Sequence, residues 1–504
     1  MGDLLKIGRL HQLSSALVGG QCAHVMLVIY GVIIVSILGT WLYLSLPVKI
    51  DNQIIMGFRL TELRFAIDSW NAGYPLLTGL DSANYIDKYS SLDQARQHGM
   101  RAIGISDDLG MYMIVPPLAS WFGLDDPGVI LKYIIFFSFF ALMCFYPLIF
   151  NRLSPSHFLV LLSPFLVIPG MAFGYISGFS AVYWVQAWVL LACTPLLWLA
   201  LKKPWNRRML HVLLVVAFIA GIASVFRSAA GLGVLGACLI VLLIKSGFSG
   251  KGLVYVTVLV LVYLVSSQGV ISLATSYRNA NLMQAGITDI RPANHPFWHT
   301  IYIGLGWQDR PMRMLEKFGP MVQEQFARLG FGKPNPWGIK YKDEFAAAKV
   351  AESDPEAVYL SKAYSDVLRQ EYFRLLRQDP WYFFQSYLLK FVTSLGVSIW
   401  MVFSFSMMTI SLGVLAISLG IFRDSLSMWR ALRSRLKESI HYFLIIAPIA
   451  GIGVLQGLLA SPNSKYLLGL TGSLYLVWML LIIFLFQSMC ERLLSTPSKL
   501  RETG

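Results

Sequence analysis

Apolar runs of about 20 residues recur along this chain of 504 residues. Each run is long enough to cross a hydrocarbon core of roughly 30 Å as a single helix. Because 56% of the residues are hydrophobic and only 13% are charged, the composition is far from that of a soluble globular domain. The sequence therefore predicts an all-α polytopic membrane protein with about ten transmembrane helices and two extracytoplasmic loop domains.

The basic residues predict how the chain is oriented in the membrane. The formal net charge is +14 at pH 7, but the basic side chains cluster in short loops such as 202–208, 245–251 and 423–437. Ten spans put these clusters on one side of the membrane and both long polar segments on the other, as the positive-inside rule requires. Membrane topology thus explains the charge, and no nucleic-acid partner is expected. The five cysteines lie in or beside spans and give neither a disulfide framework nor metal-ligand spacing.

The spans divide the chain into five parts. Residues 1–24 form a cytoplasmic tail, and 25–276 form a core of seven spans that includes an extracytoplasmic loop at 47–127. Residues 277–392 form an extracytoplasmic helical loop domain, 393–490 contain three C-terminal spans, and 491–504 are a second cytoplasmic tail. The predicted spans are His24–Leu46, Gly128–Phe150, His157–Tyr175, Ser180–Leu201, Leu210–Phe226, Ala229–Ile244, Leu253–Ser272, Gly396–Phe422, Tyr442–Leu459 and Leu467–Phe486.

The first polar loop contains the acidic residues that are the main candidates for catalysis. Asp51 follows the first span by about one helical turn and precedes a stretch able to lie along the membrane surface. Asp107 and Asp108 come later in the same loop, before the rigid pair Pro116-Pro117. The alternative for all three acids is that they cap the helices that follow them.

The order of these features resembles the opening of the GT-C glycosyltransferase superfamily. The matching pieces are a short tail, one span, Asp51 directly outside it, surface helices, Pro116-Pro117-Leu118, Phe122-Gly123 and a second span. The resemblance implies a GT-C-like core of seven spans with a large outer loop after the seventh. It also implies a polyprenyl-phosphate-linked sugar donor and an active site on the periplasmic face of a bacterial inner membrane. Asp51 is followed by Asn52 where the family often has Glu, so which acid acts as the base stays open.

The chemistry of sugar transfer assigns roles to further residues. A base must activate the acceptor hydroxyl, and positive charge must stabilise the departing lipid phosphate. The resemblance makes Asp51 the base, with Asp107 and Asp108 as the other catalytic candidates. Arg227, at an outer tip between two spans, is the candidate for the phosphate, and its alternative is snorkelling to lipid head groups. Lys465-Tyr466, in the last outer turn, resembles a basic-Tyr pair of the family; its alternative is an interfacial anchor.

The second polar segment contains two histidines among aromatic residues. The candidates for sugar or acceptor binding are His295, Trp298, His299 and Tyr302. Plain packing is the alternative, and Pro296 interferes with regular helical spacing of the two histidines. No metal ligand is assigned and no cofactor is expected with certainty, although a divalent metal shared with an acid stays open.

The predicted function is transfer of a sugar to an extracytoplasmic glycan, glycolipid or protein acceptor. An O-antigen polymerase or ligase is the alternative, because that class also acts on lipid-linked sugars and uses Arg and His in a late outer loop. A lipid or glycan transporter is disfavoured, since no inverted repeat is visible. The sugar, the acceptor and the pathway are not specified by the sequence.

Overall fold

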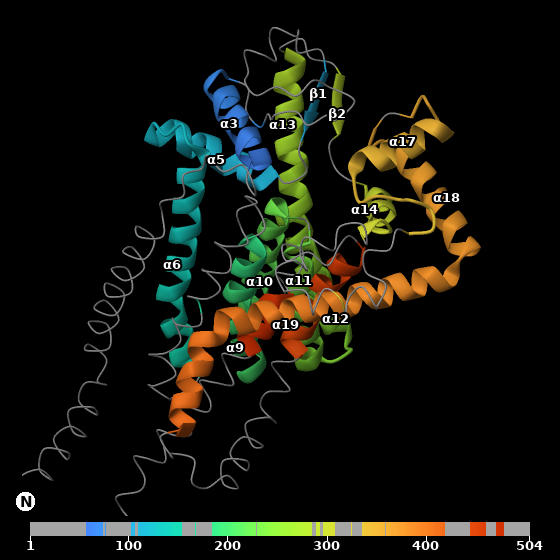
Figure 1. The fold of residues 1–504 in the computed structure, drawn as a ribbon. Helices are drawn as coiled ribbons and strands as arrows, with labels where there is room; N and C mark the ends of the chain where they lie inside the picture. The colour runs from blue at the N-terminus through green and yellow to red at the C-terminus, as the bar shows by residue number, and fades with distance from the viewer. Residues whose placement is uncertain are drawn as a thin grey trace, which may run out of the picture.

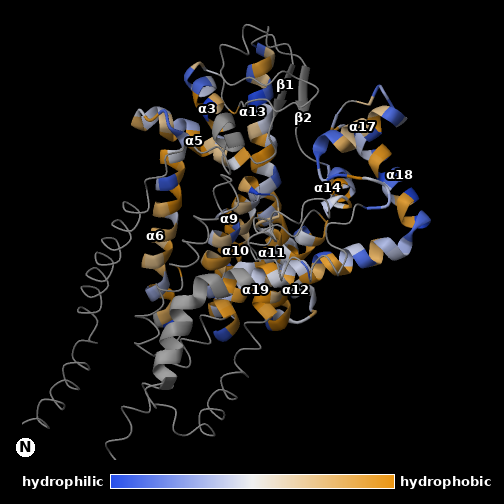
Figure 2. Cartoon of the chain, viewed as in Figure 1, coloured by the Kyte–Doolittle hydropathy of each residue, from blue (hydrophilic) through white to orange (hydrophobic). Residues whose placement is uncertain are grey.

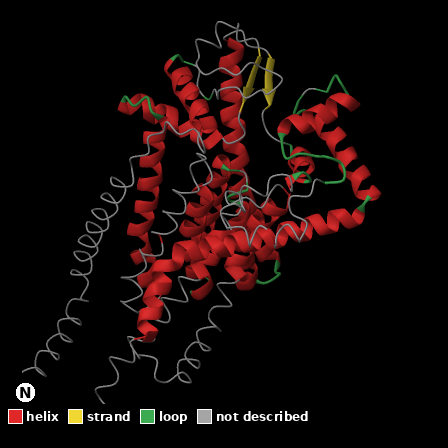
Figure 3. Ribbon diagram, in the orientation of Figure 1, coloured by secondary structure: helices red, strands yellow, loops and turns green. Residues whose placement is uncertain are grey.

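The computed structural model describes residues 57–73, 76, 102–105, 109–153, 167, 184–227, 229–284, 289–292, 296–307, 324, 335–357, 359–418, 444–459 and 470–477. Within these ranges the regular elements are helices and two short strands, joined by loops (Figure 3). Apolar helices form a bundle, one long helix rises beyond it, and a separate group of helices lies to one side (Figure 1).

Four helices of the described chain are long and apolar enough to cross a membrane. They are α6 (Pro127–Leu153), α9 (Trp184–Lys202), α10 (Arg207–Phe226) and the continuous helix Gly250–Gln284. The last consists of α12 (Gly250–Leu264), the π-helix η2 (Val265–Gly269) and α13 (Val270–Gln284). Figure 2 shows the hydrophobic colouring of the bundle. The chain is a helical membrane protein, and these helices coincide with the predicted second, fourth, fifth and seventh spans.

The described helices do not give the predicted count of ten spans. Where the sixth span was predicted, α11 (Leu232–Ser246) has only 15 residues. A helix of this length is about 22 Å long, which is less than the thickness of the hydrocarbon core, about 30 Å. The helix Leu444–Leu459, at the ninth position, is also short. At the eighth position, α19 (Pro380–Ser418) begins well before the predicted Gly396. The predicted first and third spans and most of the tenth lie outside the described residues.

Helix α10 is the centre of the bundle and contacts α9, α11, α12 and η2. It begins after Asn206, whose side chain accepts a hydrogen bond of 3.1 Å from the Met209 amide and so caps the helix. Small residues such as Ala217 and Gly221 allow its neighbours to approach. A Cβ on Gly221 would overlap the hydroxyl of Ser266 in the π-helix. The close contact therefore depends on glycine.

Two helices of the first polar loop pack onto this bundle. Helix α3 (Gly57–Asn71) lies against α5 (Leu109–Phe122), and both contact α6. Their buried side chains share the core of the bundle: Leu63, Ala66, Ile67, Met111, Tyr112 and Val115. The first loop is thus part of the packed structure.

A two-stranded parallel sheet departs from the all-α prediction. Strand β1 (Ala102–Ile105) belongs to the first polar loop and β2 (Asp289–Pro292) to the second polar segment. They pair with Ala102 opposite Asp289. The two polar segments, predicted as separate loop domains, are therefore joined by backbone hydrogen bonds.

The rest of the second polar segment forms a lateral helical unit. It consists of α14 (Phe297–Gly304), α17 (Asp343–Ser353), α18 (Lys362–Gln378) and the start of α19. The unit has its own core, formed by side chains including Tyr302, Leu305, Trp307, Ile339, Val350, Leu368 and Phe383. Helix α19 continues from this unit to the bundle, where the Lys390 ammonium donates to the Leu458 carbonyl over 2.9 Å.

Candidate functional site

Arg227 lies at the turn between α10 and α11, at the opposite end of α10 from Arg207 and Arg208. It is the only Asp, Glu, Lys or Arg between Arg208 and Lys245. The Arg227 amide donates to Ala223 O over 3.0 Å, and its carbonyl accepts from the Ala230 amide over 2.8 Å. Backbone hydrogen bonds on both sides of Arg227 therefore fix the position of its backbone. The Arg227 side chain is half-buried.

Buried hydrogen bonds between neighbouring helices stabilise this turn. The hydroxyls of Ser224 and Tyr263 are 3.0 Å apart, and the Gly231 amide donates to Ser224 Oγ over 3.2 Å. Tyr263 belongs to α12, immediately before the π-helix. These hydrogen bonds thus connect α10, the start of α11 and α12 close to the turn that holds Arg227.

The beginning of α5 packs against the residue that precedes Arg227. Gly110 lies so close to Phe226 that an added Cβ would be 2.5 Å from Cγ of the ring. Helix α5 starts at Leu109, and the two residues before Leu109 are Asp107 and Asp108. This contact brings the first turn of α5 to the residue beside Arg227.

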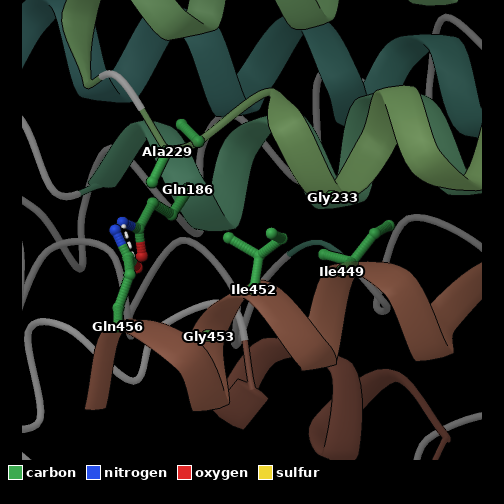
Figure 4. A pocket seen from close by; sticks show the side chains of 8 residues that line it. Gln186, Ala229, Gly233, Ile449, Ile452, Gly453 and Gln456 are labelled. Atoms are coloured by element: carbon green, nitrogen blue, oxygen red, sulfur yellow. Dashed lines mark hydrogen bonds between the residues drawn. The ribbon is translucent and has the colours of Figure 1, made fainter. Parts of the chain in front are cut away.

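A hollow opens beside the turn, among the ends of α9, α11 and the helix Leu444–Leu459 (Figure 4). It is small, with a volume of about 10 Å³, and apolar residues form most of its wall: Ala229, Ala230, Gly233, Ile449, Ile452 and Gly453. Gln186 supplies the polar side, and its amide donates to Gln456 Oε1 over 3.2 Å. The buried Gln186 Oε1 accepts no hydrogen bond within the described chain. The hollow can therefore offer one acceptor to a hydroxyl group or a water molecule.

The structure buries His299 in the lateral helical unit. Nε2 lies 3.1 Å from Asp343 Oδ1 and Nδ1 lies 2.8 Å from Tyr364 Oη. Because an ionised carboxylate only accepts hydrogen bonds, Nε2 donates, and in a neutral imidazole Nδ1 then accepts from the tyrosine. The side chain of His299 is 0% exposed, whereas that of Asp343 is 52% exposed. These bonds join α14, α17 and α18, which favours packing over sugar contact for His299.

The two other described aromatic candidates also contribute to this unit. Tyr302 is buried, and burial raises the pKa of its phenol. Trp298 is partly exposed and lies against Tyr372 and Phe373, with ring centroids 5.6 and 5.3 Å apart. Of the described candidates in this segment, Trp298 retains the most surface for a ligand.

Several predicted site residues lie outside the described residues: Asp51, Asp107, Asp108, His295, Lys465 and Tyr466. Within the described ranges, no group of three or more His, Cys, Asp or Glu could hold a metal ion. The assignments of these residues stay predictions.

Arg278, on α13, was not among the predicted site residues. It is 1% exposed, and its Nη1 is buried without a hydrogen-bond partner in the described part of the chain. A sequence signal exists, because Arg278 is the first charged residue after Lys251. The prediction that the seventh span ends near Ser272 placed this arginine in the extracytoplasmic helical loop domain 277–392, whereas the helix of the seventh span continues to Gln284.

Comparison with protein-family models, curated proteins and solved structures found no match to this chain.

Proposed function

We propose that this protein is a membrane glycosyltransferase that moves a sugar from a polyprenyl-phosphate donor to an acceptor outside the cytoplasm. The contact between Gly110 and Phe226 carries this proposal. Gly110 follows Asp108 by two residues, and Phe226 directly precedes Arg227. Two residues of chain span at most about 7 Å. We propose that this carboxylate and the Arg227 guanidinium act on one bound substrate.

These two groups suit the chemistry of an inverting transfer. The carboxylate takes the proton of the acceptor hydroxyl as the oxygen attacks the anomeric carbon. The bond from that carbon to the phosphate oxygen breaks, and the polyprenyl phosphate departs with the electron pair. Arg227 stabilises the negative charge that develops on the departing phosphate. The products are the glycosylated acceptor and polyprenyl phosphate.

The base is an acid of the first polar loop. Asp51 is the first candidate, because the resemblance to the GT-C superfamily puts the base directly after the first span. Asp107 and Asp108 are the alternatives, and the position of α5 supports them. The hollow beside Gln186 and the partly exposed Trp298 are candidate surfaces for sugar hydroxyls and rings.

In this function the chain lies in a bacterial inner membrane, with the Arg227 turn on the periplasmic side. One feature of the bundle supports the orientation. The Lys245 ammonium donates to the Lys203 carbonyl over 3.1 Å, so two basic loops meet at the end of the bundle away from Arg227. Such clustering is typical of the cytoplasmic side.

The test is release of polyprenyl phosphate by the purified protein. Undecaprenyl-phosphate sugars carrying different hexoses and pentoses are incubated with the protein and a membrane extract as the source of acceptor. We expect one donor to be consumed. Arg227→Gln should lower the rate by about 10²–10³-fold, the effect of removing one preorganised charge donor. Arg64→Gln, which changes an exposed arginine of α3, is the matched control and should remain within about twofold of wild type.

The Asn variants of the acids identify the base. Asp51→Asn should lower the rate by about 10²–10⁴-fold if Asp51 is the base, whereas Asp107→Asn and Asp108→Asn should then have little effect. Full activity in Asp51→Asn together with loss in either of the other variants transfers the role to that acid. Failure of the wild-type protein to consume or bind any donor would refute the proposed function. Polymerase or ligase chemistry gains no support from His299, since that residue is buried.

A further inference from the structure

Arg278 is a buried cation on a helix that leaves the bundle. It lies on α13 in a buried stripe with Ala274 and Leu282, four residues before and after it. Residues at this spacing share one face of a helix. The arginine therefore faces the protein interior, away from the exposed Leu273 and Tyr277 on other faces of α13.

The Arg278 guanidinium has more hydrogen-bond donors than it uses within the described chain. It carries five N–H groups and accepts nothing. Nε donates to Asn279 Oδ1 over 3.2 Å. Nη1 is buried, and no acceptor for it and no carboxylate ion pair with Arg278 exists among the residues that the structure describes. A buried charge without an opposite charge is unfavourable, so the arrangement suits an anion supplied from outside the chain.

The position of Arg278 along its helix indicates the level of that anion in the membrane. The helix begins at Gly250, beside Lys251. At a rise of 1.5 Å per residue, Arg278 lies about 42 Å from Gly250. The hydrocarbon core is roughly 30 Å thick, and the membrane with its head groups is about 40–45 Å thick. If Gly250 lies at the inner surface, Arg278 lies at the level of the opposite head groups.

The direction of the side chain strengthens this placement. Long side chains on a helix point toward its N-terminus, which for Arg278 is the direction of the membrane. A guanidinium binds phosphate oxygens with two parallel hydrogen bonds. The geometry points to Arg278 as a binding residue for the phosphate of a polyprenyl phosphate, which rests on the proposed function for its role as donor. Arg278 and Arg227 would then both act on the phosphate, Arg278 by binding it and Arg227 by stabilising its departure.

Binding without turnover tests this role. The probe is undecaprenyl phosphate added to the purified protein in detergent, with phosphatidylglycerol as the competing phosphate lipid, and the measurement is the dissociation constant of each. Arg278→Gln should weaken binding of undecaprenyl phosphate by about ten- to one-hundredfold, the worth of one charged hydrogen bond. Arg278→Lys should recover part of this loss, and Arg64→Gln should bind within about twofold of wild type.

A second measurement separates ligand binding from a structural role. Because Arg278 holds a buried charge without a partner, Arg278→Met should melt at the same temperature as ligand-free wild type or higher. Wild-type protein should be stabilised by undecaprenyl phosphate, and Arg278→Met should lose that stabilisation. Melting of ligand-free Arg278→Met well below wild type would identify a structural arginine and overturn the inference.

The remaining outcomes are also decisive. Equal affinity of wild type and Arg278→Gln for undecaprenyl phosphate would overturn the role of Arg278 and leave the proposed function standing. Binding of phosphatidylglycerol alone, lost in Arg278→Gln, would identify a phospholipid site and overturn the donor-phosphate assignment. Transfer activity is measured separately, so a protein that binds undecaprenyl phosphate through Arg278 but transfers no sugar would refute only the proposed function.

Discussion

Gly110 and Phe226 meet with no space for a side chain between them, since a Cβ on Gly110 would lie 2.5 Å from Cγ of the phenylalanine ring. Gly110 is the second residue of α5 and Phe226 is the last residue of α10, so the contact holds the start of α5 against the end of α10. This contact determines how closely the first polar loop approaches the Arg227 turn.

Gly110→Ala should therefore separate α5 from α10. Overpacking of this kind costs about 1–3 kcal/mol, and we expect a lower melting temperature together with slower sugar transfer. Gly396→Ala is the matched control, because a Cβ at Gly396 in α19 meets nothing within 4 Å. Both changes replace a helical glycine by alanine, and only the change at Gly110 introduces a clash, so the loss of stability in Gly110→Ala relative to Gly396→Ala reports that clash. Adding Phe226→Leu to Gly110→Ala should recover stability, and an unchanged Gly110→Ala protein would contradict the described contact.

Ser224 and Tyr263 should contribute unequally to stability. Tyr263→Phe removes one hydrogen bond, while Ser224 keeps the Gly231 amide as a donor; the expected cost is about 0.5–1.5 kcal/mol. Ser224→Ala removes the partner of the Tyr263 hydroxyl and of the Gly231 amide together. Leaving such buried groups without partners costs about 1–3 kcal/mol each. Melting temperatures in detergent should thus fall in the order wild type, Tyr263→Phe, Ser224→Ala, and the reverse order of the two variants would count against this network.

Cysteine labelling in intact cells tests the orientation. The background is the chain with its five cysteines replaced by serine. Ser353 ends α17 on the surface of the lateral helical unit, and Phe248, 96% exposed, lies between α11 and α12. A membrane-impermeant maleimide added from outside should label Ser353→Cys and spare Phe248→Cys until the cells are opened. Labelling of Phe248→Cys but not of Ser353→Cys in intact cells would show that the orientation in the membrane is the reverse of the proposed one.

Glu371 should make the lateral helical unit dependent on pH. The hydrogen bond from Arg374 lowers the pKa of Glu371 below 4.5, with a further contribution from Lys349 on α17. A lowered pKa in the folded state stabilises the protein above the unfolded value, and this contribution disappears as the pH falls through the folded value. Glu371→Gln should therefore reduce stability at pH 7 by about 0.5 kcal/mol, as for other ion pairs on a helix surface. The melting temperatures of variant and wild type should converge as the pH falls from 7 through the folded pKa of Glu371. An equal difference over that whole range would exclude the ion pair as the cause.

Hydropathy alone predicts the long apolar helices of the bundle. Helix α10 ends at Phe226 as predicted and begins three residues earlier than expected, and α9 ends one residue beyond Leu201. Helix α9 ends beside Lys202 and Lys203, and α10 lies between Arg207 and Arg227, so these limits follow from local composition. The count of ten fails in the described chain where a short helix such as α11 replaces a full span.

The features that depend on distant contacts could not be predicted in this way. Strands β1 and β2 have four residues each, too few for a periodic pattern, and their pairing joins segments far apart in sequence. The burial of His299 and Arg278 depends on tertiary contacts. The position of Arg227 was predictable because it is a lone charge between two apolar runs. The closeness of Gly110 to Phe226 follows from tertiary packing and has no local signature.

The pairing of β1 with β2 also sets an order of events during synthesis. β1 leaves the ribosome before α6, and its partner β2 follows only after α13. At 5–20 residues per second, the interval lasts about 10–40 s. During that time the membrane helices between the strands are made and inserted, while the edge of β1 has no strand beside it. Joining of the two polar segments is consequently a late step, so a nascent chain that stops before β2 has α6, α9, α10 and the helix Gly250–Gln284 but cannot complete the sheet.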